Sequence, residues 1–113
     1  MNTEELYTKT NLHKPPRTDK DHMIIFTEHA KTKLLKELKK LGITKQLATK
    51  TLKNPDELFY DALRERYVAV NWNHNMAIIY EKTNNKITVV TIIYSSELKD
   101  TVDRRKRTGR WIQ

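Results

Sequence analysis

The chain has 113 residues, enough for one domain with a modest core and too few for two ordinary domains. Its 22 Lys and Arg outnumber its 14 Asp and Glu, and this net charge of +8 favours a polyanionic partner, nucleic acid before any other. The absence of cysteine excludes a disulfide framework, a thiolate nucleophile and a zinc–thiolate site.

The N-terminal stretch differs from the rest of the chain. Residues 1–22 balance four basic against four acidic side chains, contain Pro15-Pro16 and show no sustained period. We therefore predict a flexible N-terminal arm, followed by a single domain over residues 23–113. The arm lacks the basic start and apolar run of a signal peptide, and no apolar run approaches the roughly 18 residues of a membrane span. We expect a cytoplasmic protein that does not bind membranes.

The first third of the domain predicts a strand and two helices. Met23–Phe26 is a short apolar run typical of a strand. The next stretch gathers its apolar residues on one helical face: Ala30, Leu34, Leu38 and Leu41. Thr27 is the expected N-cap of this helix, and Gly42 is the expected C′ residue. Thr44 can cap the second helix, which Asn54-Pro55 ends.

The remainder predicts strands and a last helix. Four runs have strand character: LFYDAL, RYVAVNW, MAIIYEK and KITVVTIIY. Turn signals at residues 73–75 and at Asn84-Asn85 indicate hairpins, and Ser95-Ser96 can cap the final helix. These elements predict an α+β fold: two N-terminal helices packed on a twisted, mostly antiparallel sheet of four to five strands, with a C-terminal helix.

Two basic groups are predicted to bind nucleic acid. On the first helix, His29 heads a row of cations on the face opposite the leucines, and this row contains Lys33, Lys36 and Lys40. Residues 99–110 carry six basic and two acidic side chains. Five of these cations are candidate nucleic-acid contacts: Arg104, Arg105, Lys106, Arg107 and Arg110. The alternative interpretation is a solvated surface that keeps the protein soluble.

RNA cleavage without a metal is a chemistry that these residue types allow, because the 2′-hydroxyl of RNA is an internal nucleophile. The reaction needs a base, cations near the phosphorane and an acid for the leaving oxygen. The candidate catalytic residues are His29, Arg64, Arg66 and Tyr94. We assign His29 as acid or base, and Arg64 or Arg66 as phosphate clamp. The alternative interpretation makes His29 an ordinary surface residue. It makes Arg64 and Arg66 charges that protect a strand edge from aggregation, and Tyr94 a residue that closes the core.

Two further patterns leave alternatives open. Asp56, Glu57 and Asp61 are close in sequence, as in a magnesium-dependent nuclease, but no acid-x-lysine motif follows them on a strand. We therefore expect no metal and no cofactor. Trp111 lies beyond the last predicted strand and either packs the tail down or stacks on a base.

The residues also resemble a known family. FTEHA at the start of the first helix, Gly42-Ile43-Thr44, Asn54-Pro55-Asp56, the strands RYVAV and AIIYEKTNNKITVVTIIY, and the tail RRKRTGRW resemble the DUF4258 family over roughly residues 24–111. That family is similar to the RelE-like branch of the barnase, EndoU, colicin and RelE ribonuclease fold. The resemblance implies a helix pair on an antiparallel sheet, and a toxin-like, metal-independent RNA endonuclease. By this analogy His29 matches the family's helix histidine, and Lys33 stands where arginine is usual.

The sequence therefore predicts a RelE-like domain that binds RNA, with DNA as a second possibility, and cleaves RNA through a cyclic phosphate. The alternative is a non-catalytic nucleic-acid-binding or regulatory protein on the same scaffold, because a shared fold does not fix activity. A toxin-like function implies a neutralising partner, a small acidic protein of the antitoxin kind.

Overall fold

The computed structural model describes residues 22–113, and the predicted arm lies outside them apart from His22. The strands are β1 (Met23–Phe26), β2 (Glu57–Asp61), β3 (Arg66–Asn71), β4 (Met76–Thr83), β5 (Lys86–Tyr94) and β6 (Trp111–Ile112). The helices are α2 (Glu28–Lys33), α3 (Lys45–Lys53) and α4 (Leu98–Arg107). Shorter helical segments are η1 (Leu34–Leu38, π), η2 (Lys39–Leu41, 3₁₀) and η3 (Trp72–His74, 3₁₀).

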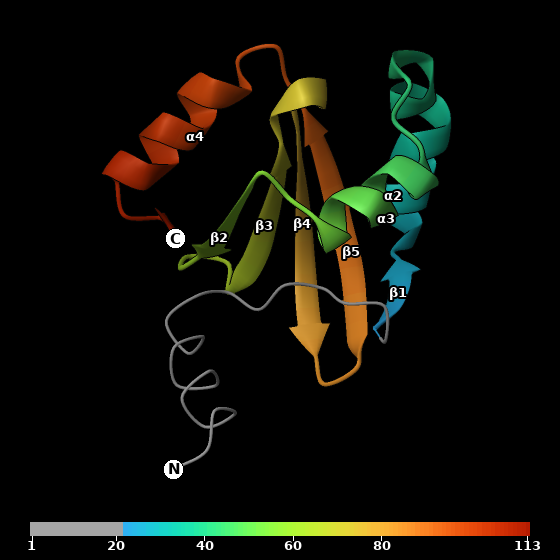
Figure 1. Cartoon of the computed structure of the whole chain (residues 1–113), viewed down its shortest axis with the longest axis horizontal. Helices are drawn as coiled ribbons and strands as arrows, with labels where there is room; N and C mark the ends of the chain where they lie inside the picture. The colour runs from blue at the N-terminus through green and yellow to red at the C-terminus, as the bar shows by residue number, and fades with distance from the viewer. Residues whose placement is uncertain (1–21) are drawn as a thin grey trace.

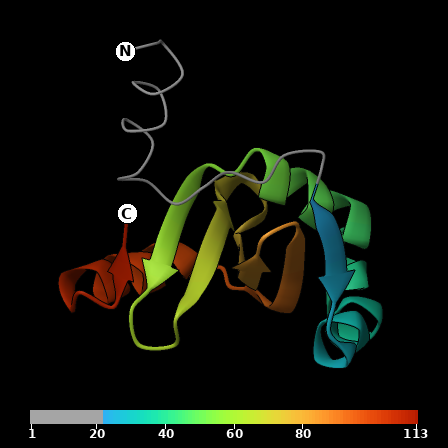
Figure 2. The same ribbon diagram turned by 90° about the horizontal axis from the view of Figure 1, so that it is seen from below.

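The strands form one curled, mixed sheet in the order β1-β5-β4-β3-β2-β6 (Figures 1 and 2). Only β1 and β5 pair in parallel, and every other neighbouring pair is antiparallel. The predicted α+β class is confirmed. The predicted sheet of four to five strands is wrong, because the described part of the chain forms six. The sixth strand has only two residues, too few to show a period in sequence.

Two apolar cores fill the two faces of the sheet. The larger lies under α2, η1 and α3, and the helices contribute Ala30, Leu34, Leu38, Ala48 and Leu52 to it. The smaller lies under α4 and contains Phe59, Val68, Val70, Ala77, Ile79, Leu98, Val102 and Trp111. Figure 1 shows α4 at one end of the sheet and the α2–α3 pair at the other. We call the side of the smaller core the α4 face.

Hydrogen bonds from Thr27 fix the start of α2 against β5. The Thr27 hydroxyl accepts a bond from the Ala30 N–H at 3.1 Å and donates to the Val90 carbonyl at 2.9 Å. Val90 is the extra residue at a β-bulge, because Thr91 pairs with Ile79 while Val89 pairs with Tyr80. The predicted N-cap is confirmed, and the same hydroxyl places the first turn of the helix beside the bulge.

The other predicted helix ends are confirmed in part. The Thr44 hydroxyl accepts a bond from the Leu47 N–H, and Gly42 adopts the left-handed conformation (φ 77°) that ends η2. The predicted cap of α4 by Ser95-Ser96 is wrong in detail. The residue before α4 is Glu97, which makes no side-chain cap, and the Ser95 hydroxyl instead accepts a bond from the Glu97 N–H within the preceding turn.

Two leucines on η1 test the assignment of the helix faces. Leu38 is 2% exposed in the larger core, whereas Leu35 is 72% exposed on the same segment. Leu38→Ala should lower the free energy of unfolding by about 2–5 kcal/mol, because it removes buried methyl groups and leaves a cavity. Leu35→Ala is the matched control and should change it by less than about 0.5 kcal/mol in the same denaturant titration. Equal losses for the two variants would contradict the assigned faces.

Candidate nucleic-acid interface

A buried carboxylate, Asp61, stands at the end of β2 and organises the turn into β3. Its Oδ1 accepts the backbone N–H groups of Leu63 and Arg64, each at 3.0 Å, and the Arg110 Nε–H at 3.3 Å. Its Oδ2 accepts the indole N–H of Trp111 at 3.2 Å. The Asp61 side chain is 4% exposed, so this one carboxylate ties the turn to a tail that lies about fifty residues away in sequence.

The environment of Asp61 favours its charged form. Burial alone raises the pKa of this carboxyl, but three hydrogen bonds oppose burial, from the Arg64 N–H, Arg110 and Trp111. The positive charge of Arg110 acts in the same direction, and the net result is a pKa below the ordinary value. Asp61 therefore remains an anion at neutral pH.

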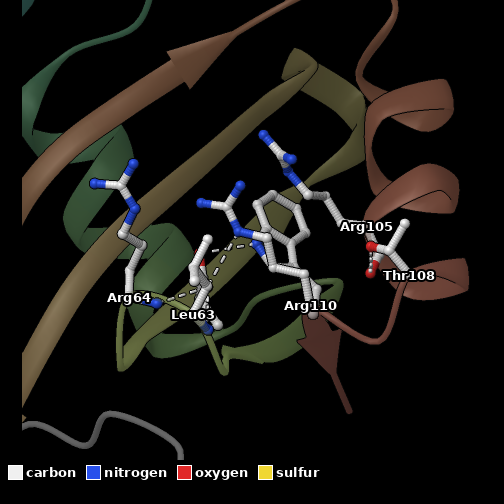
Figure 3. A network of polar contacts seen from close by, with 7 residues as sticks. Leu63, Arg64, Arg105, Thr108 and Arg110 are labelled. Carbon is white, nitrogen blue, oxygen red and sulfur yellow. Dashed lines mark hydrogen bonds and ion pairs between the residues drawn. The ribbon is translucent and has the colours of Figure 1, made fainter.

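Three arginines from three segments gather around this anion: Arg64 from the β2–β3 turn, Arg105 from α4, and Arg110 from the α4–β6 connection. We call these three side chains the arginine cluster. Figure 3 shows their guanidinium groups extending to the same side of the network. Each carries one positive charge and Asp61 carries one negative charge, so the cluster has an excess of two positive charges.

The excess of positive charge in the cluster acts on the guanidinium of Arg105. Burial lowers the pKa of its guanidinium, and the charges of Arg110, Arg104 and Arg64 lower it further, while Asp61 alone raises it. The Nε atom of Arg105 is buried, and among residues 22–113 it has no hydrogen-bond partner. The cluster is therefore a place where an added anion would relieve electrostatic repulsion.

Trp111 packs the C-terminal tail onto the protein. It is 4% exposed, pairs with Asp61 as part of β6, and its ring centroid lies 5.8 Å from that of Phe59. Of the two alternatives left open by the sequence, the structure supports packing, because a buried indole cannot stack on a base.

A second group of predicted residues meets at the start of α2. His29 is exposed, and its Nε2 lies 3.1 Å from the Thr91 hydroxyl oxygen on β5. His29, Lys33 and Lys36 line a shallow pocket of about 260 Å³, together with Thr32 and Glu37. We call these three basic side chains the helix row. Lys40, also predicted, is exposed on η2 and does not line this pocket.

The four candidate catalytic residues do not lie together in one constellation. Thr91, next to His29, pairs with Ile79 on the α4 face, whereas Tyr94 pairs with Met76, which belongs to the larger core on the opposite face. Arg66 donates from Nε to Glu81 at 3.4 Å. Arg64 belongs to the arginine cluster at the β2–β3 turn, and strands β3 and β4 lie between β2 and β5.

The C-terminal cations divide between two surfaces. Arg105 and Arg110 belong to the arginine cluster. The remaining three, Arg104, Lys106 and Arg107, line an open groove of about 490 Å³ along α4 with Asp100 and Asp103.

Structural bonds occupy the carboxylates that were considered as magnesium ligands. Asp56 accepts the Trp72 backbone N–H at 2.7 Å, and Glu57 accepts the Trp72 indole N–H at 2.8 Å and the Gln113 amide at 2.9 Å. Asp61 accepts hydrogen bonds from the β2–β3 turn and from the C-terminal tail, as described above. Over residues 22–113, no three His, Asp or Glu side chains are grouped so that they could hold a metal ion.

Sequence analysis missed one basic surface and the role of Asp61. Lys45, Lys50 and Lys53 line a groove of about 430 Å³ between α3 and β1, where the Lys45 ammonium lies 5.2 Å from the Phe26 ring centroid. The row of lysines along the second helix was an available signal for this groove. An Asp two residues before a turn N–H was an available signal for the bonds of Asp61 within the turn.

Comparisons with known proteins return no relative for this chain: no family model, curated protein or solved structure matches it. The resemblance to the DUF4258 family and to RelE-like ribonucleases therefore stays a prediction. Among the described residues, no helix has the length and apolar character needed to cross a membrane.

Asp61→Asn tests whether the carboxylate organises this site. The amide cannot accept four bonds or balance Arg110, so at neutral pH the free energy of unfolding should fall by roughly 1.5–3 kcal/mol. Because the pKa of Asp61 is lowered in the folded protein, its contribution is present above the ordinary carboxyl pKa and is lost as pH falls through the folded value. The difference between wild type and variant should therefore shrink in acid in denaturant titrations. A difference that is constant with pH would contradict the assigned role.

Proposed function

We propose that this protein binds RNA, with the arginine cluster as a phosphate contact. The observation that carries the proposal is the excess of positive charge around Arg105, where Arg110, Arg104 and Arg64 outweigh Asp61. Arginine is suited to this task because its planar guanidinium binds phosphate oxygens in pairs and keeps its charge when partly buried. Asp61 holds the turn and Arg110 in place before any ligand arrives.

The position of the helix row supports a longer contact surface. The Thr91 hydroxyl beside His29 and the carboxylate of Asp61 both belong to the α4 face of the sheet. From β5 to β2 there are three strand spacings of about 4.8 Å each, or roughly 14 Å. A single RNA strand that crosses this face would meet the arginine cluster at one end and His29 at the other. The resemblance to ribonucleases, rather than this geometry, favours RNA over DNA.

Metal-independent cleavage of the bound RNA is a second candidate function, which the position of His29 favours. Its imidazole is exposed, is held near Thr91, and stands beside Lys33 and Lys36. In this proposal His29 acts as acid or base, and the lysines stabilise the phosphorane. The RelE-like fold, the toxin-like activity and an acidic, antitoxin-like partner belong to the same proposal and rest on the family resemblance.

Binding should depend steeply on salt. Because each phosphate contact releases counterions, the logarithm of the association constant should fall linearly with the logarithm of salt concentration, with a slope of several units. Replacing Arg104, Arg105 and Arg107 by alanine should flatten the slope, as measured by fluorescence anisotropy with a short labelled RNA. Binding that ignores salt, or a triple variant with an unchanged slope, would contradict the proposal.

Cleavage should depend on His29 and not on divalent cations. If the second candidate is right, RNA is cut in the presence of a chelator, leaves 2′,3′-cyclic phosphate ends, and the matching DNA is spared. His29→Ala should then slow cleavage by about 10²–10⁴ with little change in RNA affinity. Thr32→Ala is a control on the same turn, because Thr32 lines the pocket without an ionisable group. Binding without turnover at any pH would leave a non-catalytic RNA-binding protein.

A further inference from the structure

The arginine cluster carries more charge than an internal phosphate of RNA would balance. We propose that it is a site for a terminal phosphate, a phosphate monoester at the end of an RNA strand, rather than for a phosphodiester within it. The proposal rests on the RNA binding proposed above and names the part of the RNA that the site recognises.

Charge is the first reason. The three arginines of the cluster and their neighbour Arg104 contribute four positive charges and Asp61 one negative charge, an excess of three. A phosphodiester carries one negative charge and would leave the cluster underbalanced. A phosphate monoester carries about −1.5 to −2 at neutral pH and balances more of the excess than a diester does. The mutual repulsion that lowers the pKa of Arg105 would be relieved most fully by the dianion.

The number of donors is the second reason. Three guanidinium groups from three separate segments extend to one side of the network (Figure 3). A monoester offers three terminal oxygens, whereas a diester offers only two that are not bonded to carbon. The Arg105 Nε is covered by the protein, so the donors that this side chain can offer a phosphate are its two terminal Nη groups.

Preorganisation is the third reason. Asp61 accepts the Arg64 backbone N–H and the Arg110 Nε–H, so one buried carboxylate fixes the backbone of Arg64 and the guanidinium of Arg110. Arg105 is fixed separately by its place on α4. Asp61 thus acts as a positioning residue: it does not face the phosphate as a partner but keeps the donors in place.

The site recognises the phosphorylated end of an RNA strand and makes no contact that depends on the base. Trp111, the aromatic side chain beside the cluster, is buried and bonded to Asp61, so it offers no surface for stacking. Phosphate recognition by guanidinium groups carries no sequence information. We therefore expect the preference for a phosphorylated end to be the same for RNAs of different sequence.

The experiment compares one short RNA in three forms, with a 5′-phosphate, with a 3′-phosphate, or with hydroxyls at both ends. Affinities are measured by anisotropy in chelator near pH 7.5. We expect one phosphorylated form to bind at least about tenfold more tightly than the hydroxyl form, and the two phosphorylated arms show which end is held. Inorganic phosphate at millimolar concentration should reduce this preference by competing for the cluster.

Matched variants assign the preference to the cluster. Arg64 is exposed, so Arg64→Gln should leave the fold intact and reduce the preference several-fold; Arg105→Gln should abolish it. Arg107→Gln removes the same charge from an exposed position on the same helix outside the cluster. Arg107→Gln should weaken the binding of all three RNAs equally and leave the preference for a phosphorylated end unchanged. Thermal unfolding of each variant verifies that it is folded.

Titration of the ligand gives an independent readout. The second pKa of a phosphate monoester is about 6, so the preference should fall as the pH is lowered from about 7.5 to 5. RNA binding with equal affinity for all three forms would overturn this proposal and leave the proposed function standing. A preference that Arg64→Gln does not reduce would also overturn it. Failure of every RNA to bind at low salt would overturn the proposed function, and this site with it.

Discussion

The buried carboxylate of Asp61 is the interaction on which the arrangement of the basic residues depends. Placing an anion in the protein interior is unfavourable unless hydrogen bonds and opposite charge compensate it. Here the turn N–H groups, Arg110 and Trp111 provide that compensation, and each is thereby fixed in place. One side chain thus closes the β2–β3 turn, holds β6 at the edge of the sheet, and binds the guanidinium of Arg110.

The rest of the fold places His29 against the α4 face at β5. The β-bulge at Val90 leaves a carbonyl that Thr27 uses, and this bond brings the first turn of α2 to β5. His29 consequently lies beside Thr91, while its neighbours Lys33 and Lys36 share its pocket. The α4 face therefore has the arginine cluster near β2 and His29 near β5, with the strands between them.

Local features of the fold could be predicted from sequence, whereas features set by distant contacts could not. The caps at Thr27 and Thr44 follow from bonds within three residues, and both were predicted. β6 was missed because two residues carry no period, and its position depends on Asp61, fifty residues before Trp111. For the same reason Asp61 was considered only as a metal ligand, and Arg64 was assigned to a different site from Arg105 and Arg110. Tyr94 was assigned to the same catalytic site as His29. The alternation of side chains along β5, which the bulge shifts by one residue, instead puts Tyr94 on the opposite face of the sheet from Thr91.

The most direct test of this account is a nitrogen-15 NMR titration that follows the Nε–H signals of the arginines and the Trp111 indole signal as a 5′- or 3′-phosphorylated RNA is added. We expect the Arg105 Nε–H signal to shift strongly, because the phosphate binds the terminal Nη groups of the same guanidinium. The Trp111 signal should stay almost unchanged, since Asp61 already holds it. Saturating RNA that moves the signals of Lys33 and Lys36 but leaves Arg105 unchanged would contradict the central claim.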